Sequence, residues 1–165
     1  MIPHRPSTAR RAAAGTAAAL ALLLSALAPG GPAAAWQAGE ILEGRAHAKD
    51  GDGIVIDGIE VRMQGVAAPE HNGARVDRGG PEATRALAGL IDGQHVTCRL
   101  DGTSTRGRPV GVCSHDGRDL GQVLISQGFA RDCPRYSGGR YRAAELQARA
   151  EGRDLSAIYP LPGYC

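Results

Sequence analysis

The sequence predicts a small domain of the α+β class, mainly β, in which five short strands form a barrel and three helices pack outside it. Short segments after residue 40 alternate between polar and apolar residues, which is typical of strands with one buried face. Helical patterns lie between these segments and after them. Four cysteines, an even number, predict two disulfides.

Residues 1–35 have the layout of a secretory signal peptide. Three arginines and no acid come first, followed by an Ala/Leu run (12–27), a Pro/Gly interruption and three alanines (33–35). The alternative is an uncleaved anchor, but the run of about 16 residues is shorter than the roughly 20 that a spanning helix needs. We therefore predict cleavage after Ala35, export to the periplasm or the extracellular medium, and no stable membrane association afterwards.

The remaining residues, 36–165, have the length of one domain and a nearly balanced charge, with 16 basic and 17 acidic residues. Such a domain does not coat nucleic acid through bulk charge, so an acidic ligand needs a local basic patch. Residues 131–153 supply six arginines against three acids, which predicts either such a patch or an ordinary solvated face. Nothing in the sequence predicts a protein partner.

Five segments alternate as strands do: 41–48, 53–57, 59–66, 95–100 and 108–113. Asp57-Gly58 is a strong signal for a tight hairpin between the second and third of them. The turn-rich sequence DGTSTRG joins the last two.

Three further segments predict helices: 81–91, 119–128 and 140–151. Pro81 suits the first turn of a helix, Asp119 is a good N-cap, and Gly128 favours a helix end. Polar, glycine-rich stretches at 69–80 and 132–139 predict loops. Five strands with an inserted helix are typical of a small, partly open barrel of the OB type.

The cysteines are expected to be paired, because an exported protein folds in an oxidising compartment. A hairpin centred between Thr105 and Arg106 places Cys98 opposite Cys113. Cys133 and Cys165 then pair with each other and tie the C-terminal tail to the domain. A zinc site is disfavoured, since there is no C-x-x-C pair and no histidine at ligand spacing.

Acids and arginines gather on turns and strand ends around DGDG (50–53), Arg62, Glu70 and Arg108. One carboxylate beside two arginines suits phosphodiester hydrolysis: the arginines bind phosphate oxygens and the carboxylate takes a proton from attacking water. Each feature alone also fits a plainer role. DGDG also fits a simple turn, and the two arginines fit solvated strand positions.

Five segments taken together resemble the staphylococcal nuclease, or thermonuclease, family: KDGDGIVIDGIEVRMQGVAAPE (49–70), GGPEATRALAGLI (79–91), VTCRLDGTSTRGRPVGVC (96–113), DLGQVLISQGFA (119–130) and YRAAELQARAEG (141–152). The resemblance covers about residues 41–152 in order. It implies a five-stranded OB barrel with three helices, and a hydrolase that cleaves DNA and RNA, commonly with calcium.

Carried over by position, the resemblance makes Arg62 and Arg108 the phosphate-binding arginines and Glu70 the general base. Asp52 matches a calcium ligand, and Asp50 could support it from a second layer. Of the nucleotide-binding positions, Tyr136 keeps an aromatic residue, whereas Arg106 stands where the family places a tyrosine.

The sequence departs from the family pattern at two positions that concern the metal. Gly53 stands where the family carries a hydroxyl residue, and Ala67 stands in place of a second calcium aspartate. A hard cation needs about six oxygens, so the loss of a carboxylate weakens the expectation of a Ca²⁺ cofactor. Two functions are therefore predicted: an exported endonuclease acting on DNA or RNA, or a catalytically silent nuclease-like module for binding or structure outside the cytoplasm.

Overall fold

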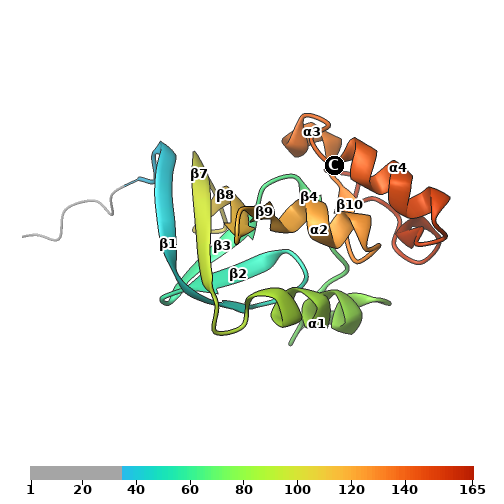
Figure 1. Ribbon diagram of the computed structural model, residues 1–165, viewed down its shortest axis with the longest axis horizontal. Coiled ribbons are helices and arrows are strands. Elements are labelled where there is room, and N and C mark those ends of the chain that lie inside the picture. The colour runs from blue at the N-terminus through green and yellow to red at the C-terminus, as the bar shows by residue number, and fades with distance from the viewer. Residues whose placement is uncertain (1–34) are drawn as a thin grey trace, which may run out of the picture. The chain divides into compact units, whose positions relative to one another are not determined.

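Figure 1 shows the computed structural model of the protein, which describes residues 35–165. The predicted signal peptide lies outside this range except for Ala35, so its cleavage stays a prediction. The described residues belong to one compact unit.

Five strands form the barrel: β1 (Ala38–Ala48), β2 (Gly53–Ile56), β3 (Ile59–Met63), β7 (His95–Thr105) and β8 (Arg108–His115). Neighbours pair antiparallel in the order β3-β2-β1-β7-β8. The barrel is closed rather than partly open, because β3 and β8 also pair, in parallel. Gly111, opposite Met63 in this pairing, makes room for β7 on its other side, since a Cβ there would lie 2.7 Å from the carbonyl oxygen of Arg99.

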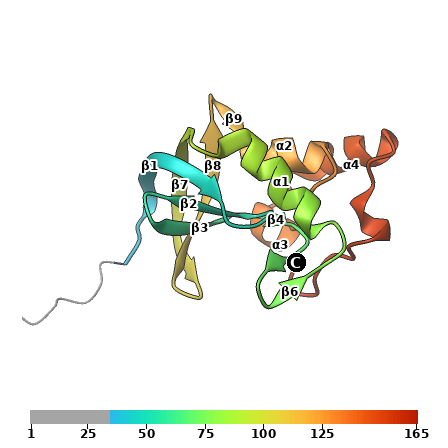
Figure 2. The ribbon, with the colours of Figure 1, turned by 90° about the horizontal axis from the view of Figure 1, so that it is seen from below.

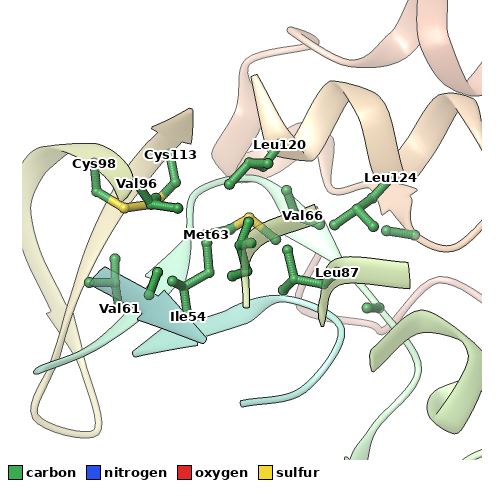
Figure 3. Close-up of a cluster of buried hydrophobic side chains, with 14 of the residues drawn as sticks. Ile54, Val61, Met63, Val66, Leu87, Val96, Cys98, Cys113, Leu120 and Leu124 are labelled. Carbon is green, nitrogen blue, oxygen red and sulfur yellow. A yellow bond between two sulfur atoms is a disulfide. The ribbon is translucent and has the colours of Figure 1, made fainter. Parts of the chain in front are cut away.

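The core is aliphatic, as expected for a chain with so few aromatic residues. Ile54, Val61 and Met63 from the barrel meet Leu87 of α1 and Leu124 of α2, and each is at most 2% exposed (Figure 3). Close burial of this kind contributes about 1.5–3 kcal/mol for each large aliphatic side chain. The core therefore fixes the barrel wall on which the candidate site is built.

Cys98 and Cys113 face each other on β7 and β8 and form the predicted disulfide. The turn, at Arg106-Gly107, lies one residue later than predicted. A bulge within residues 100–104 of β7 offsets this difference, so the cysteines remain opposite one another.

The predicted strand 59–66 is interrupted at Gly65. This residue has φ 71°, and a Cβ there would lie 2.5 Å from the Cβ of Ser137. The chain leaves the barrel at this point and continues as β4 (Val66–Ala67), which pairs with β10 (Arg131–Asp132).

The predicted helices are present as α1 (Gly80–Ile91), α2 (Leu120–Ser126) and α4 (Arg142–Ala150). They lie beside the barrel, and α2 packs against both α1 and α4 (Figure 2). The predicted number of helices was too low, because a short fourth α-helix, α3 (Pro134–Ser137), occupies the predicted loop 132–139. No helix in the described part of the chain combines the length and apolar character needed to cross a bilayer.

The remaining elements are short: β5 (His71–Asn72), β6 (Arg75–Val76), β9 (Arg118–Asp119) and the 3₁₀ helix η1 (Leu155–Ala157). The first two form a small hairpin inside the predicted loop 69–80. After η1 the tail returns to the domain, where the predicted Cys133–Cys165 disulfide is formed. Arg131 donates from its guanidinium to the carbonyl of Tyr159 at 3.2 Å, which fixes the tail a second time.

Candidate functional site

Arg62 and Arg108 lie on neighbouring strands of the barrel wall and point away from its core. Val61 and Met63, on either side of Arg62, are buried, and so is Pro109, which follows Arg108. Side chains alternate between the two faces of a strand, so both arginines belong to the outer face. The parallel pairing of β3 with β8 brings them onto one surface.

Arg62 is held by a buried carboxylate. Its Nη1 lies 2.8 Å from Oδ1 of Asp52, and its Nη2 donates to the carbonyl of Val66 at 3.4 Å. The other oxygen of Asp52 accepts the backbone N–H of Ala68 at 3.1 Å. Gly51 allows this close approach of the two loops, because a Cβ there would lie 2.6 Å from that of Ala68. Arg62 and Asp52 therefore act as one fixed unit.

Burial raises the pKa of Asp52 to about 7, although Arg62 and the N–H of Ala68 lower it and the neighbouring charges of Asp50 and Glu70 raise it. Burial lowers the pKa of Arg62, but Asp52 and the further charges of Tyr164, Asp50 and Glu70 together outweigh this effect and raise the pKa above its usual value. The site thus combines a permanently charged guanidinium with a carboxyl that exchanges its proton near neutral pH.

Arg108 is held by a different carboxylate, that of Glu60. Its Nη1 donates to Oε1 of Glu60 at 2.9 Å, and its Nε makes a long contact of 3.4 Å to the carbonyl of Thr105. The side chains of Arg108 and Glu60 are 20% and 31% exposed, so this pair is more open to solvent than that of Arg62 and Asp52.

Glu70 lies on the loop between β4 and β5. Its Oε2 accepts from Asn72 at 2.8 Å and its N–H donates to Asp77 at 3.3 Å. Gly80 makes room for this loop, because a Cβ there would overlap the carbonyl oxygen of Glu70. Within residues 35–165, Glu70 makes no hydrogen bond to either arginine, but its charge contributes to the raised pKa values of Asp52 and Arg62.

A sequence profile described as staphylococcal nuclease homologue matches residues 60–156, more than half of the chain. The chain belongs to the staphylococcal nuclease homologue family. It is also 33% identical over 131 residues to the succinoglycan biosynthesis protein ExoI of Rhizobium meliloti (strain 1021), a match that covers 74% of this chain and 69% of that protein. Membership of this family agrees with the five-stranded barrel.

The family implies calcium, and the residues present do not fit this ion. Ala67, at the position of the second aspartate, is fully buried in an apolar cluster with Cys133 and Tyr159. The two carboxylate oxygens of Asp52 are already bound, one to the guanidinium of Arg62 and the other to the backbone N–H of Ala68. Within residues 35–165, no group of three or more acidic, histidine or cysteine side chains is placed to hold a metal. A hard cation that needs about six oxygens lacks its donors here.

Asp50, expected to support a metal from a second layer, accepts the backbone N–H of Asp52 at 3.2 Å and is buried. This contact shapes the loop that carries Asp52. Asp50 therefore serves the geometry of the ion pair.

The two predicted nucleotide-binding residues lie on α3 and in the turn between β7 and β8. Tyr136 is 52% exposed on α3, with the guanidinium of Arg135 5.9 Å from its ring centre. Arg106 is exposed in the β7–β8 turn with φ 50°. In the described part of the chain, neither side chain makes a hydrogen bond or ion pair with Arg62 or Arg108.

The basic segment 131–153 is partly neutralised by its own acids. Glu145 lies 2.9 Å from Arg131 and 2.8 Å from Arg149, and Arg153 pairs with Glu151. The remaining arginines of the segment are exposed: Arg135, Arg140 and Arg142.

Sequence reasoning missed Glu60 and the packing of the tail against Ala67. Glu60 stands two residues before Arg62 in the alternation of β3, a signal for a shared face, but its partner lies on another strand. The packing of Tyr159 against Ala67 joins segments far apart in the chain and has no local signal.

Proposed function

We propose that this chain is an exported nuclease that hydrolyses phosphodiester bonds of DNA or RNA. The supporting observation is the surface shared by Arg62 and Arg108, with Glu70 on the adjoining loop. Two guanidinium groups on one surface can bind the oxygens of a phosphate and stabilise the charge that develops on it.

In this proposal Glu70 takes a proton from the attacking water. The water oxygen forms a bond to phosphorus, the ester P–O bond breaks, and the leaving oxygen takes a proton from solvent. The side-chain amide of Asn72 donates a hydrogen bond to Oε2 of Glu70, while Oε1 has no hydrogen-bond partner among the described residues. In this proposal Oε1 accepts the water proton. General bases of this kind contribute about 100-fold or more to the rate.

The substrate is proposed to pass over α3. The exposed ring of Tyr136 offers a surface for a base to stack on, and such stacking tolerates any sequence. Arg106 and the exposed arginines of α3 and α4 would contact the backbone phosphates. Contacts of this kind orient a nucleic acid without reading its sequence.

Export to the periplasm or the medium is part of the proposal. Disulfides persist in oxidising compartments, and the described residues contain two. The signal-peptide layout of residues 1–35 supports the same location.

A catalytically silent binding module is the second candidate, and a specific observation favours it. Both arginines are already paired with carboxylates, and Ala67 is packed beneath the tail. Such a module would bind a polyanion through the exposed arginines without cleaving it.

A cleavage assay separates the two candidates. The chain is expressed with export, so that both disulfides form, and incubated with single-stranded DNA or RNA in calcium, manganese, magnesium or EDTA. The nuclease proposal expects cleavage that Glu70→Gln slows by about 100-fold or more and that Glu82→Gln, on the exposed face of α1, leaves unchanged. Absence of cleavage in every arm by folded protein would support the silent module.

A further inference from the structure

The two arginines of the site are held in different ways. Arg62 and its partner Asp52 are 17% and 6% exposed, and Asp52 is also fixed by a backbone N–H. Arg108 and its partner Glu60 are 20% and 31% exposed. Within residues 35–165, Glu60 makes no side-chain hydrogen bond other than the one to Arg108. The second pair is therefore free to exchange its partner.

Glu60 belongs to the strand of Arg62 but binds the arginine of the neighbouring strand. The register of the parallel pair, with Arg62 opposite Val110, places Glu60 level with Arg108. Its carboxylate lies 2.9 Å from Nη1 of Arg108, the distance of a charge-assisted hydrogen bond. A phosphate oxygen that approaches Arg108 from this surface finds its guanidinium already bound to the carboxylate of Glu60.

We propose that Glu60 is a positioning residue that holds Arg108 toward the site and is displaced from it by a phosphate of the substrate. This inference rests on the proposed function for the identity of the anion as a nucleic-acid phosphate. It assigns different tasks to the arginines: Arg62 is a fixed donor, and Arg108 exchanges an internal carboxylate for the ligand.

The chemistry of the guanidinium supports this exchange. Carboxylate and phosphate match the same planar fork of N–H donors. Nε of Arg108 is only weakly engaged, at 3.4 Å from the carbonyl of Thr105, so the side chain has no strong second restraint. Glu60 is nearly one-third exposed and returns to water when displaced.

The exchange has a measurable effect on affinity. Glu60→Gln removes an ion pair that is open to solvent. The affinity of Arg108 for an anion should therefore rise by about two- to fivefold. Arg108 would then meet the phosphate as a free cation, and the cations condensed on the nucleic acid are released with no freed Glu60 carboxylate left to attract them again. For a single strand, the slope of log K against log salt should become steeper by up to about 0.7, the value for one fully neutralised phosphate.

The test measures binding of a fluorescently labelled single-stranded DNA oligonucleotide by anisotropy over a range of salt concentrations. The proteins are the wild type, Glu60→Gln, Glu60→Asp, Arg108→Met and the double variant Glu60→Gln/Arg108→Met. Glu82→Gln is the matched control, because it removes the same charge from the exposed pair with Arg85. Melting curves verify that each variant is folded.

The expected result is tighter binding and a steeper salt slope for Glu60→Gln, with Glu60→Asp close to the wild type and Glu82→Gln unchanged. In the Arg108→Met background, Glu60→Gln should have no effect. Equal affinity and slope for Glu60→Gln and the wild type would overturn the inference, as would a gain that persists without Arg108.

A second probe separates this inference from the proposed function. Inorganic phosphate is titrated while the Nε–Hε signal of Arg108 is followed by NMR. If no variant binds the oligonucleotide but phosphate shifts this signal more strongly in Glu60→Gln than in the wild type, the nucleic-acid proposal fails and the exchange at Arg108 holds. If phosphate leaves the signal unchanged in every variant, the inference is wrong.

Discussion

Replacement of Asp52 by asparagine should change how the stability of the protein depends on pH. Burial raises the pKa of this carboxyl from an ordinary value of 3.8 to about 7 in the folded protein. Between these two pH values the folded protein keeps the proton and the unfolded chain releases it. The contribution of Asp52 to the free energy of unfolding is therefore fully present below about pH 4 and is lost as the pH rises through 7.

The size of the effect follows from the same two values. The two pKa values differ by about three units, and each unit corresponds to 1.36 kcal/mol. As the pH rises, the free energy of unfolding of the wild type should therefore fall by up to about 4 kcal/mol relative to Asp52→Asn. The asparagine does not titrate, so any constant cost of the substitution leaves the slope unaffected.

The assay is urea unfolding of the wild type and Asp52→Asn at several values between about pH 4 and about pH 8. Asp57→Asn serves as the control, because Asp57 is exposed in the β2–β3 turn at φ 46°, where asparagine is readily accepted. A difference between wild type and Asp52→Asn that is constant over this range would refute the reasoning. A wild type that gains stability with rising pH would show that the attraction of Arg62 exceeds the cost of burial.

The other predictions concern the tail, the metal and the Glu70 loop. Replacing Cys133 and Cys165 by serine together should lower the free energy of unfolding by about 4 kcal/mol, from the 32-residue separation that the bond closes, as measured in urea. Calcium should leave the melting temperature unchanged, whereas a bound ion at 100 times its Kd would stabilise the fold by about 2.7 kcal/mol. Gly80→Ala should displace the loop of Glu70 and reduce cleavage, whereas Gly89→Ala, with open space around it, should gain about 0.5–1 kcal/mol and keep its activity.

The barrel strands and the Cys98–Cys113 disulfide were predictable because their signals are local, and the Cys133–Cys165 pair followed from the two cysteines that remained. Alternation located the five strands, and Asp57-Gly58 located a hairpin that the structure contains. The Cys98–Cys113 pair was predicted correctly although its turn lies one residue later, because the bulge at 100–104 compensates. Closure of the barrel was not predicted, since the parallel pairing of β3 with β8 depends on contacts between distant segments.

The sequence pointed to the residues of the candidate site but not to the ion pairs that they form. Arg62, Glu70 and Arg108 were found as acids and arginines on turns and strand ends, and the resemblance assigned their roles, but the sequence does not reveal that a carboxylate already holds each arginine. The environment of Ala67 was equally hidden, because β4 and β10 have two residues each and carry no periodic pattern. Such elements are set by tertiary packing.

The most direct test of the proposed nuclease is the initial rate of single-stranded DNA cleavage in EDTA, for the wild type and Glu70→Gln. Because the residues at the site do not fit calcium, we expect the wild type to cleave without a divalent cation and the variant to be slower by about 100-fold or more. Equal rates for the two proteins, or cleavage that appears only when calcium is added, would contradict the assignment of the chemistry to Arg62, Glu70 and Arg108 alone.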